Sequence, residues 1–214
     1  MIKTLFDIFL FLGSEWVLWI LGGCSLLCIA VIFDRRRAIS AQDRVGERLW
    51  AGALRVWVTD QVPADWALQA PEFLKRYPCV EARLLNSLAN RNRITTGDIE
   101  KISLSVLAAE RLELERNLAI LGTLGNSAPF IGLFGTVLGI IKAFSQLDQA
   151  ASGSGLNSVS GGLAEALVTT AAGLLVALPS AIAFNYFQRK IKAIFSRSMS
   201  IAGAVGSSHK EERI

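Results

Sequence analysis

Long stretches without a charged side chain restrict the fold of this sequence more than any other feature. Residues 117–141 are twenty-five residues without a charge, residues 16–33 are eighteen, and residues 149–188 are forty with one charge, Glu165. A helix that crosses a bilayer needs about 20 mostly apolar residues. Helices buried in a soluble core are the alternative, but three such runs in one chain of 214 residues disfavour it. We therefore predict three transmembrane helices, at 14–33, 118–144 and 161–187.

The composition excludes several classes of protein. Hydrophobic residues make up 52% of the chain, which is far too apolar for a disordered protein and disfavours a soluble enzyme. The spacing of Cys24, Cys28 and Cys79 fits neither a disulfide framework nor a zinc site, and the one histidine, His209, lies in the polar tail. We therefore expect no metal, no cofactor and no enzymatic activity. A net charge of +4 suits the cytoplasmic edge of a membrane protein better than a nucleic-acid binder.

The basic residues near the ends of the spans predict the orientation. Arg35, Arg36 and Arg37 follow the first span, and Arg189, Lys190 and Lys192 follow the third, whereas the loop between the second and third has only Lys142 at its rim. Because Lys and Arg accumulate on the cytoplasmic side, the amino terminus is predicted outside and the carboxyl terminus inside. We expect the first span to be retained as an anchor, since no cleavable signal peptide is evident. The remaining segments are then 1–13, an amphipathic segment at the outer surface; 34–117, a cytoplasmic helical domain; 145–160, a periplasmic loop; and 188–214, a cytoplasmic helix and tail.

The cytoplasmic part is predicted to be helical. Residues 38–117 carry eleven basic and eleven acidic side chains, a balance typical of a solvated helical surface. No proline follows Asp98 until Pro129, and the apolar spacing continues into the second span, so we predict one helix over 98–145, about 70 Å long. The fold class is all-α, with the second and third membrane helices extended into a cytoplasmic bundle. Apolar faces on such helices need partners, and copies of the same chain are the simplest ones.

Small residues recur at spacings of three and four in the second span. They are Gly132, Gly135, Thr136 and Gly139. In lipid, such residues let two helix backbones approach closely, so packing alone is the plainest interpretation of the glycines. Pro129 is predicted to kink this helix because it lacks a backbone N–H.

Glu165 is the candidate functional residue of the third span. An ionisable group inside the bilayer costs about 2.5–3.5 kcal/mol or more, and it indicates a functional site unless it reaches the water at the rim. Thr136 and Thr170 lie deeper, both about 12–14 Å below the outer edge of the membrane. Thr169 shares a helix face with Glu165 and is a candidate for the proton pathway together with Glu165, Thr136 and Thr170. Thr170 lies about 140° around the helix from Glu165, so a narrow stripe cannot hold both, whereas a pore shared between neighbouring subunits can.

Residues 128–144 (APFIGLFGTVLGIIKAF) and 161–187 (GGLAEALVTTAAGLLVALPSAIAFNYF) resemble the ExbB/TolQ/MotA proton-channel family, and specifically its ExbB/TolQ branch. The resemblance implies a pentamer around a central pore that holds two single-span helices of an ExbD/TolR-type partner, each with an aspartate. It implies that Glu165 is the pore acid, that Thr136 and Thr170 are pore threonines, and that Pro179 is the proline of the family's third span. The first 97 residues depart from the pattern, which leaves TonB-linked import, Tol-Pal envelope constriction and gliding open.

The function implied is a motor subunit in the bacterial inner membrane that is driven by the proton motive force. Its partners are then the ExbD/TolR-type protein and a TonB-type, TolA-type or gliding-machinery protein of the envelope. A carboxyl exchanges protons, and threonine hydroxyls both donate and accept hydrogen bonds, so the residues suit a water wire. The alternative is a membrane scaffold that conducts nothing. A secondary transporter is disfavoured because that class has more spans and internal repeats.

Overall fold

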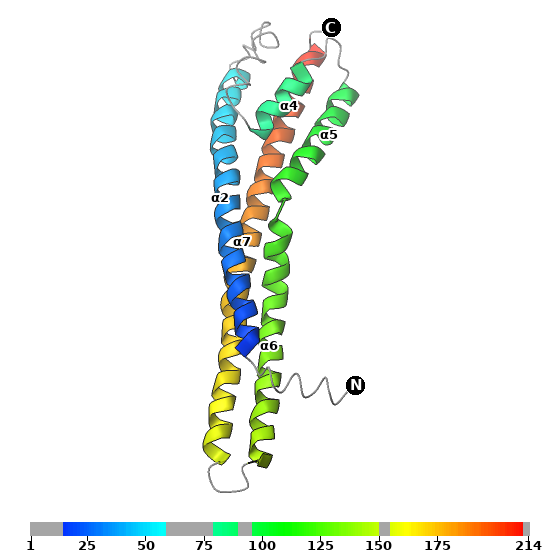
Figure 1. The fold of residues 1–214 in the computed structure, drawn as a ribbon. Coiled ribbons are helices and arrows are strands. Elements are labelled where there is room, and N and C mark those ends of the chain that lie inside the picture. The colour runs from blue at the N-terminus through cyan, green and yellow to red at the C-terminus, as the bar shows by residue number, and fades with distance from the viewer. Residues whose placement is uncertain (1–14, 59–78, 90–95, 150–154, 212–214) are drawn as a thin grey trace. The chain divides into compact units, whose positions relative to one another are not determined.

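All regular structure in the described part of the chain is α-helical. The computed structural model describes residues 15–58, 79–89, 96–149 and 155–211. The predicted outer segment 1–13 lies outside them. The helices are α2 (Glu15–Val58), α4 (Val80–Ala89), α5 (Thr96–Glu115), α6 (Leu118–Gln149) and α7 (Gly155–Glu211) (Figure 1). The all-α class is confirmed.

Three of the described helices are long and apolar enough to cross a membrane. The candidate spans lie within Glu15–Ala51, Leu118–Ser145 and Val159–Gly203, with mean hydropathies of 2.4, 1.6 and 2.0. Large apolar side chains are exposed on all three, among them Trp19, Phe130 and Leu175. Such surface is costly in water and stable in lipid. The prediction of three membrane-capable helices is therefore confirmed.

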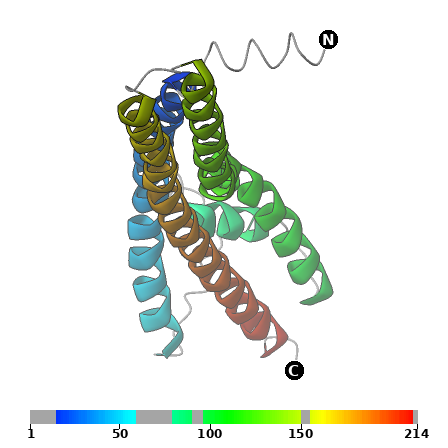
Figure 2. The same cartoon turned by 90° about the horizontal axis from the view of Figure 1, so that it is seen from below.

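The chain divides into two compact units, and the first contains the apolar helical segments. This unit comprises the described residues of Met1–Phe33 and Asn117–Asn185. Figure 2 shows the three segments side by side. The buried core takes two side chains from each helix, and it consists of Val17, Leu21, Ala128, Leu138, Val176 and Ala177.

Helices α6 and α7 pack backbone to backbone in this unit. A Cβ on Gly132 would lie 2.8 Å from the carbonyl oxygen of Thr169, and one on Gly173 would lie 2.6 Å from that of Ala128. Both distances are too short for a side chain. Glycine is required here because any larger residue would separate the two helices.

The second unit comprises Asp34–Arg116 and Tyr186–Ile214, as far as they are described. Helix α4 packs with α5. Its apolar face is buried in a core cluster made of Cys79, Ala82, Leu85 and Ile201, with Val45, Leu49 and Trp50 packed around it. A helix as short as α4 is marginal by itself in water, so this burial is what stabilises it.

One predicted helix is interrupted in the structure. Instead of a single helix over 98–145, α5 ends at Glu115 and α6 begins at Leu118, with a turn between them. Asn117 adopts a left-handed conformation with φ of 64°, and its carbonyl accepts a hydrogen bond from the N–H of Ile120 at 3.2 Å. Asparagine tolerates this conformation better than most residues, so a helix can end without Gly or Pro. The prediction of a continuous second helix was therefore wrong.

The other long helices continue beyond the predicted membrane spans. The first span continues without a break to Val58, and α7 runs to Glu211. The second span continues to Gln149 and the third begins at Gly155, so both helices occupy parts of the segment 145–160 that was predicted as a loop. A helix satisfies its own backbone hydrogen bonds, so it need not end where the apolar stretch ends.

Candidate functional site

Glu165 lies on α7 in the first unit and is half-buried. The next residue, Ala166, is buried against α6, because a Cβ on Gly139 would lie only 2.7 Å from the Ala166 Cβ. Glu165 therefore lies at the edge of the contact between α6 and α7. It is the only charged residue in the forty-residue stretch 149–188.

Thr169 lies one turn further along α7 and is fully buried. Its hydroxyl lies 2.6 Å from the carbonyl oxygen of Ala166 and 3.3 Å from that of Gly132, and it donates to them. A Cβ on Gly135 would lie 2.8 Å from the same hydroxyl oxygen. Thr169 thus fills the space that the glycines of α6 leave.

The other two threonines differ in their surroundings. Thr170 is half-buried, and its hydroxyl donates to the Gly132 carbonyl at 3.4 Å. Thr136 is buried, and it donates to the Leu133 carbonyl of its own helix at 2.7 Å. The structure therefore brings Thr169 and Thr170 of α7 together at the Gly132 carbonyl of α6. Thr136 lies on α6 itself.

Both predicted prolines lie inside helices, Pro129 in α6 and Pro179 in α7. Next to Pro179, the buried Ser180 donates to the Val176 carbonyl at 2.8 Å, and its hydroxyl lies 2.9 Å from the Cys28 Sγ of α2. This contact between α2 and α7 was not predicted. Two small polar residues in separate spans give no signal of pairing in a sequence.

An open apolar hollow of about 400 Å³ lies elsewhere in the first unit. Its walls include Trp16, Ile20, Phe130 and Phe134, and the rings of Trp16 and Phe134 meet edge to face at 6.2 Å. None of the predicted site residues lines it. Among the residues that the structure describes, no group of His, Cys, Asp or Glu side chains is arranged to hold a metal ion.

A cluster of charged side chains in the second unit was also missed. Asp43 accepts hydrogen bonds from Lys190 at 2.7 Å and from Arg197 at 2.6 Å, and Glu47 and Glu81 also lie near Arg197. Asp43 and Glu47 share one face of α2, and Lys190 and Arg197 are seven residues apart on α7. These spacings were the available signal, but they do not say which helices meet.

The fold and these contacts define a multi-pass membrane protein with a few polar side chains at a tight helix–helix contact. The MotA/TolQ/ExbB proton channel family matches residues 78–199, which is more than half of the chain. The chain belongs to this family.

Similar proteins are named ExbB and TolQ, which confirms the ExbB/TolQ branch. The biopolymer transport protein ExbB of Xanthomonas campestris is 34% identical over 175 residues, covering 78% of this chain and 68% of that protein. The Tol-Pal system protein TolQ of Pseudomonas aeruginosa is 38% identical over 96 residues, covering 45% of this chain and 41% of that protein. The ExbB of Neisseria gonorrhoeae is 47% identical over 74 residues, 35% of this chain and 33% of that protein. The match thus spans less than half of TolQ.

Proposed function

We propose that this chain is the proton-channel subunit of a motor in the bacterial inner membrane, driven by the proton motive force. Copies of the chain form a pentamer around a pore, and an ExbD/TolR-type partner with one span contributes an aspartate there. The motor delivers work to a TonB-type, TolA-type or gliding-machinery protein of the envelope. The amino terminus is periplasmic and the carboxyl terminus cytoplasmic.

The observation that carries this proposal is the position of Glu165. Glu165 is the one charged residue in the apolar stretch 149–188, where a charge is costly, and its side chain is only half-buried, so water can reach it. The chain belongs to a family described as proton channels, and this also favours proton exchange at the Glu165 carboxyl. We assign Glu165 the role of taking up and releasing the proton.

Thr170 and Thr136 are assigned to the water wire that serves Glu165. A hydroxyl that donates to a carbonyl still accepts hydrogen bonds from water, so both threonines can hold a water chain. Thr169, predicted with them, is fully buried and takes a packing role instead.

Proton flux into vesicles that contain the purified complex with its partner tests the proposal. Glu165→Gln keeps the shape of the side chain but cannot exchange a proton, so we expect flux at the background level. Glu165→Asp keeps the carboxyl on a shorter side chain and should retain part of the flux. Both variants should assemble with the partner as the wild type does.

The alternative is a scaffold that conducts nothing. It predicts that Glu165→Gln leaves the driven activity intact, because only the packing of the helices then matters. Undiminished proton flux in Glu165→Gln vesicles would overturn the channel and leave the scaffold as the better function.

A further inference from the structure

Glu81, in the first turn of α4, has a fully buried side chain. Neither of its carboxyl oxygens makes a hydrogen bond, and the Nε of Arg197 also lacks one. Buried carboxylates in proteins are nearly always hydrogen-bonded or paired, because an isolated charge is expensive to bury. The ion pair of Glu81 with the Nε of Arg197, at 3.4 Å and without a hydrogen bond, is a weak partner for a fully buried carboxylate.

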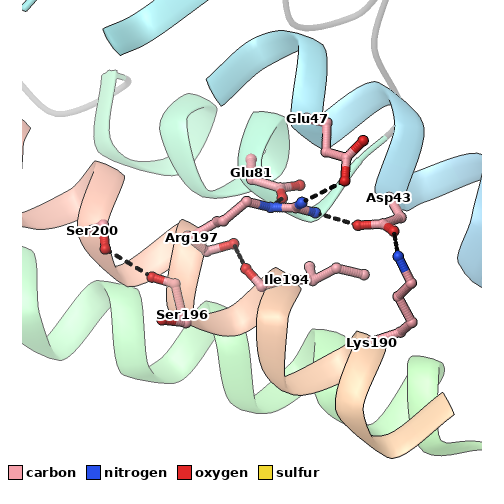
Figure 3. Close-up of polar contacts among 9 residues, drawn as sticks. Asp43, Glu47, Glu81, Lys190, Ile194, Ser196, Arg197 and Ser200 are labelled. Carbon is pink, nitrogen blue, oxygen red and sulfur yellow. Dashed lines mark hydrogen bonds and ion pairs between the residues drawn. The ribbon is translucent and has the colours of Figure 1, made fainter. Parts of the chain in front are cut away.

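The positive charge near Glu81 is shared with two other carboxyl groups. Figure 3 shows the side chain of Arg197 among those of Asp43, Glu47 and Glu81. Its nitrogen atoms lie 2.6 Å, 3.5 Å and 3.4 Å, respectively, from carboxyl oxygens of these three residues. Lys190 pairs with Asp43 at 2.7 Å. Three acidic groups from α2 and α4 therefore face two basic groups of α7. Both basic groups make their shortest ion pair with Asp43.

Among the described residues, no charged side chain besides Arg197 compensates Glu81. Arg83, on the same helix, forms its ion pair with Glu110 of α5, the helix that packs with α4. Burial raises the pKa of the neighbouring Cys79 thiol to about 11, so this thiol stays neutral and adds no charge. With every acidic group ionised, the cluster carries one negative charge in excess, and Glu81 is the acid in it without a hydrogen bond.

The carboxyl of Glu81 also lies directly against the backbone of α2. A Cβ on Gly46 would lie 2.6 Å from the Glu81 carboxyl carbon, so the carboxyl occupies the space that this glycine leaves on α2. The carboxyl is enclosed by α2 on one side and by Arg197 of α7 on the other. An ionised Glu81 reaches water only if α4 moves away from these helices.

Burial raises the pKa of Glu81 above its ordinary value of 4.5, and its own backbone N–H, Arg197 and Cys79 oppose the change only in part. A group whose pKa is raised in the docked state stabilises docking fully below its ordinary pKa. It loses that contribution as the pH rises through the raised value. Docking of α4 is therefore favoured by acid and weakened by base.

We propose that Glu81 is a proton-dependent latch that holds α4 against α2 and α7 while its carboxyl is protonated and releases α4 when it ionises. The latch lies wholly in the second unit and does not depend on the proposed channel function. Its predicted location on the cytoplasmic side makes it a sensor of cytoplasmic pH.

Cys79 is a natural reporter for this latch, because its side chain is fully buried in the cluster beneath α4. In the test, Cys24 and Cys28 are replaced by alanine and the full chain is reconstituted in lipid nanodiscs. The quantity to be measured is the rate at which a maleimide labels Cys79. The rate is compared between the chain with Glu81 and the chain with Glu81→Gln from about pH 5.5 to about pH 8.5. Because Glu81 also raises the pKa of the Cys79 thiol, each rate is first divided by the rate of the same chain unfolded in denaturant at that pH, and the ratio of these normalised rates reports docking.

We expect the ratio of the Glu81 rate to the Glu81→Gln rate to rise with pH across this range, because the ionised carboxyl disfavours docking whereas the amide is neutral at every pH. Glu47→Gln is the matched control. This variant removes an exposed carboxylate that pairs with the same Arg197 but keeps Glu81. Its Cys79 labelling rate, relative to that of the Glu81→Gln chain, should therefore still rise with pH. A ratio that stays constant with pH overturns the latch, and so does loss of the rise in Glu47→Gln.

Glu81→Gln must itself protect Cys79 at the acid end, because a neutral amide of the same shape should dock. Rapid labelling there overturns the proposal. If that variant does not fold, hydrogen exchange of the wild type decides. After correction for the intrinsic pH dependence of exchange, protection of the α4 amides should fall as the pH rises, and protection independent of pH overturns the latch.

Discussion

At the scale of single residues, Thr169 and Thr170 are adjacent in sequence but have different surroundings. The hydroxyl of Thr169 is buried between α6 and α7 and donates to two carbonyl oxygens. We expect Thr169→Val to lower the free energy of unfolding by about 0.5–1.5 kcal/mol, the usual net value of a hydrogen bond. Thermal unfolding of the purified protein measures this. Unchanged stability together with lost proton flux would return Thr169 to the proton pathway.

Thr170 is half-buried, and the hydrogen bond that its hydroxyl donates to the Gly132 carbonyl is long, at 3.4 Å. We expect Thr170→Val to reduce proton flux in vesicles at least severalfold while the unfolding temperature stays close to that of the wild type. The hydroxyl is lost at nearly constant volume, so water loses a partner and the packing keeps its shape. Normal flux in this variant would remove Thr170 from the water wire.

The sequence shows Glu165 as a candidate because one charge in an apolar stretch is visible without a structure. It does not separate Thr169 from Thr170, since periodicity gives the faces of a helix but not which face meets α6. The ionic cluster around Arg197 was missed for a similar reason. Its members come from α2, α4 and α7, and only packing of the chain brings Asp43, Glu81 and Lys190 together.

At the scale of helices, the contact between α6 and α7 depends on small residues. A Cβ on Gly139 would lie 2.7 Å from the Cβ of Ala166, whereas one on Gly23 of α2 would meet nothing within 4 Å. We expect Gly139→Leu to destabilise the protein by about 1–3 kcal/mol or more, as overpacking does, and to abolish the oligomer. Gly23→Leu is the control, with little effect on thermal unfolding or on size. Wild-type stability with a changed complex size would mean that Gly139 serves a contact between copies.

The existence of the long helices was predictable from apolar length, but the break between α5 and α6 was not. Neither Gly nor Pro marks it, and the left-handed Asn117 is a conformational choice that composition does not reveal. We expect Asn117→Gly to leave stability nearly unchanged. Asn117→Ile should cost about 1–2 kcal/mol, because a β-branched residue fits the left-handed region poorly. Equal unfolding temperatures for both variants would mean that the turn does not need this conformation.

At the scale of the whole molecule, the proposed orientation in the membrane rests on the basic residues that flank the spans. A reporter enzyme that folds only in the periplasm should be active when fused at Ser154 and silent when fused at Gln61 or after Arg197. Arginine and lysine near the ends of spans stay on the cytoplasmic side. Activity of the Gln61 fusion would reverse the proposed orientation.

Assembly is the other property of the whole molecule, and α5 supplies the test of it. Leu104 and Leu112 are 54% and 76% exposed on this helix, which belongs to the second unit and not to the predicted spans. In the proposed orientation α5 lies in the cytoplasm, away from lipid, so we expect copies of the chain to cover these two side chains. The mass of the detergent-solubilised complex should then be five times 23.2 kDa, before any partner is added.

Leu112→Glu should shift this mass to smaller species because it places a charge in the contact between copies. Glu113→Lys changes the charge at an exposed position that lies about 180° around the helix from Leu104 and about 100° from Leu112, and it should leave the mass unchanged. An unchanged mass for Leu112→Glu would mean that copies do not meet through this face of α5.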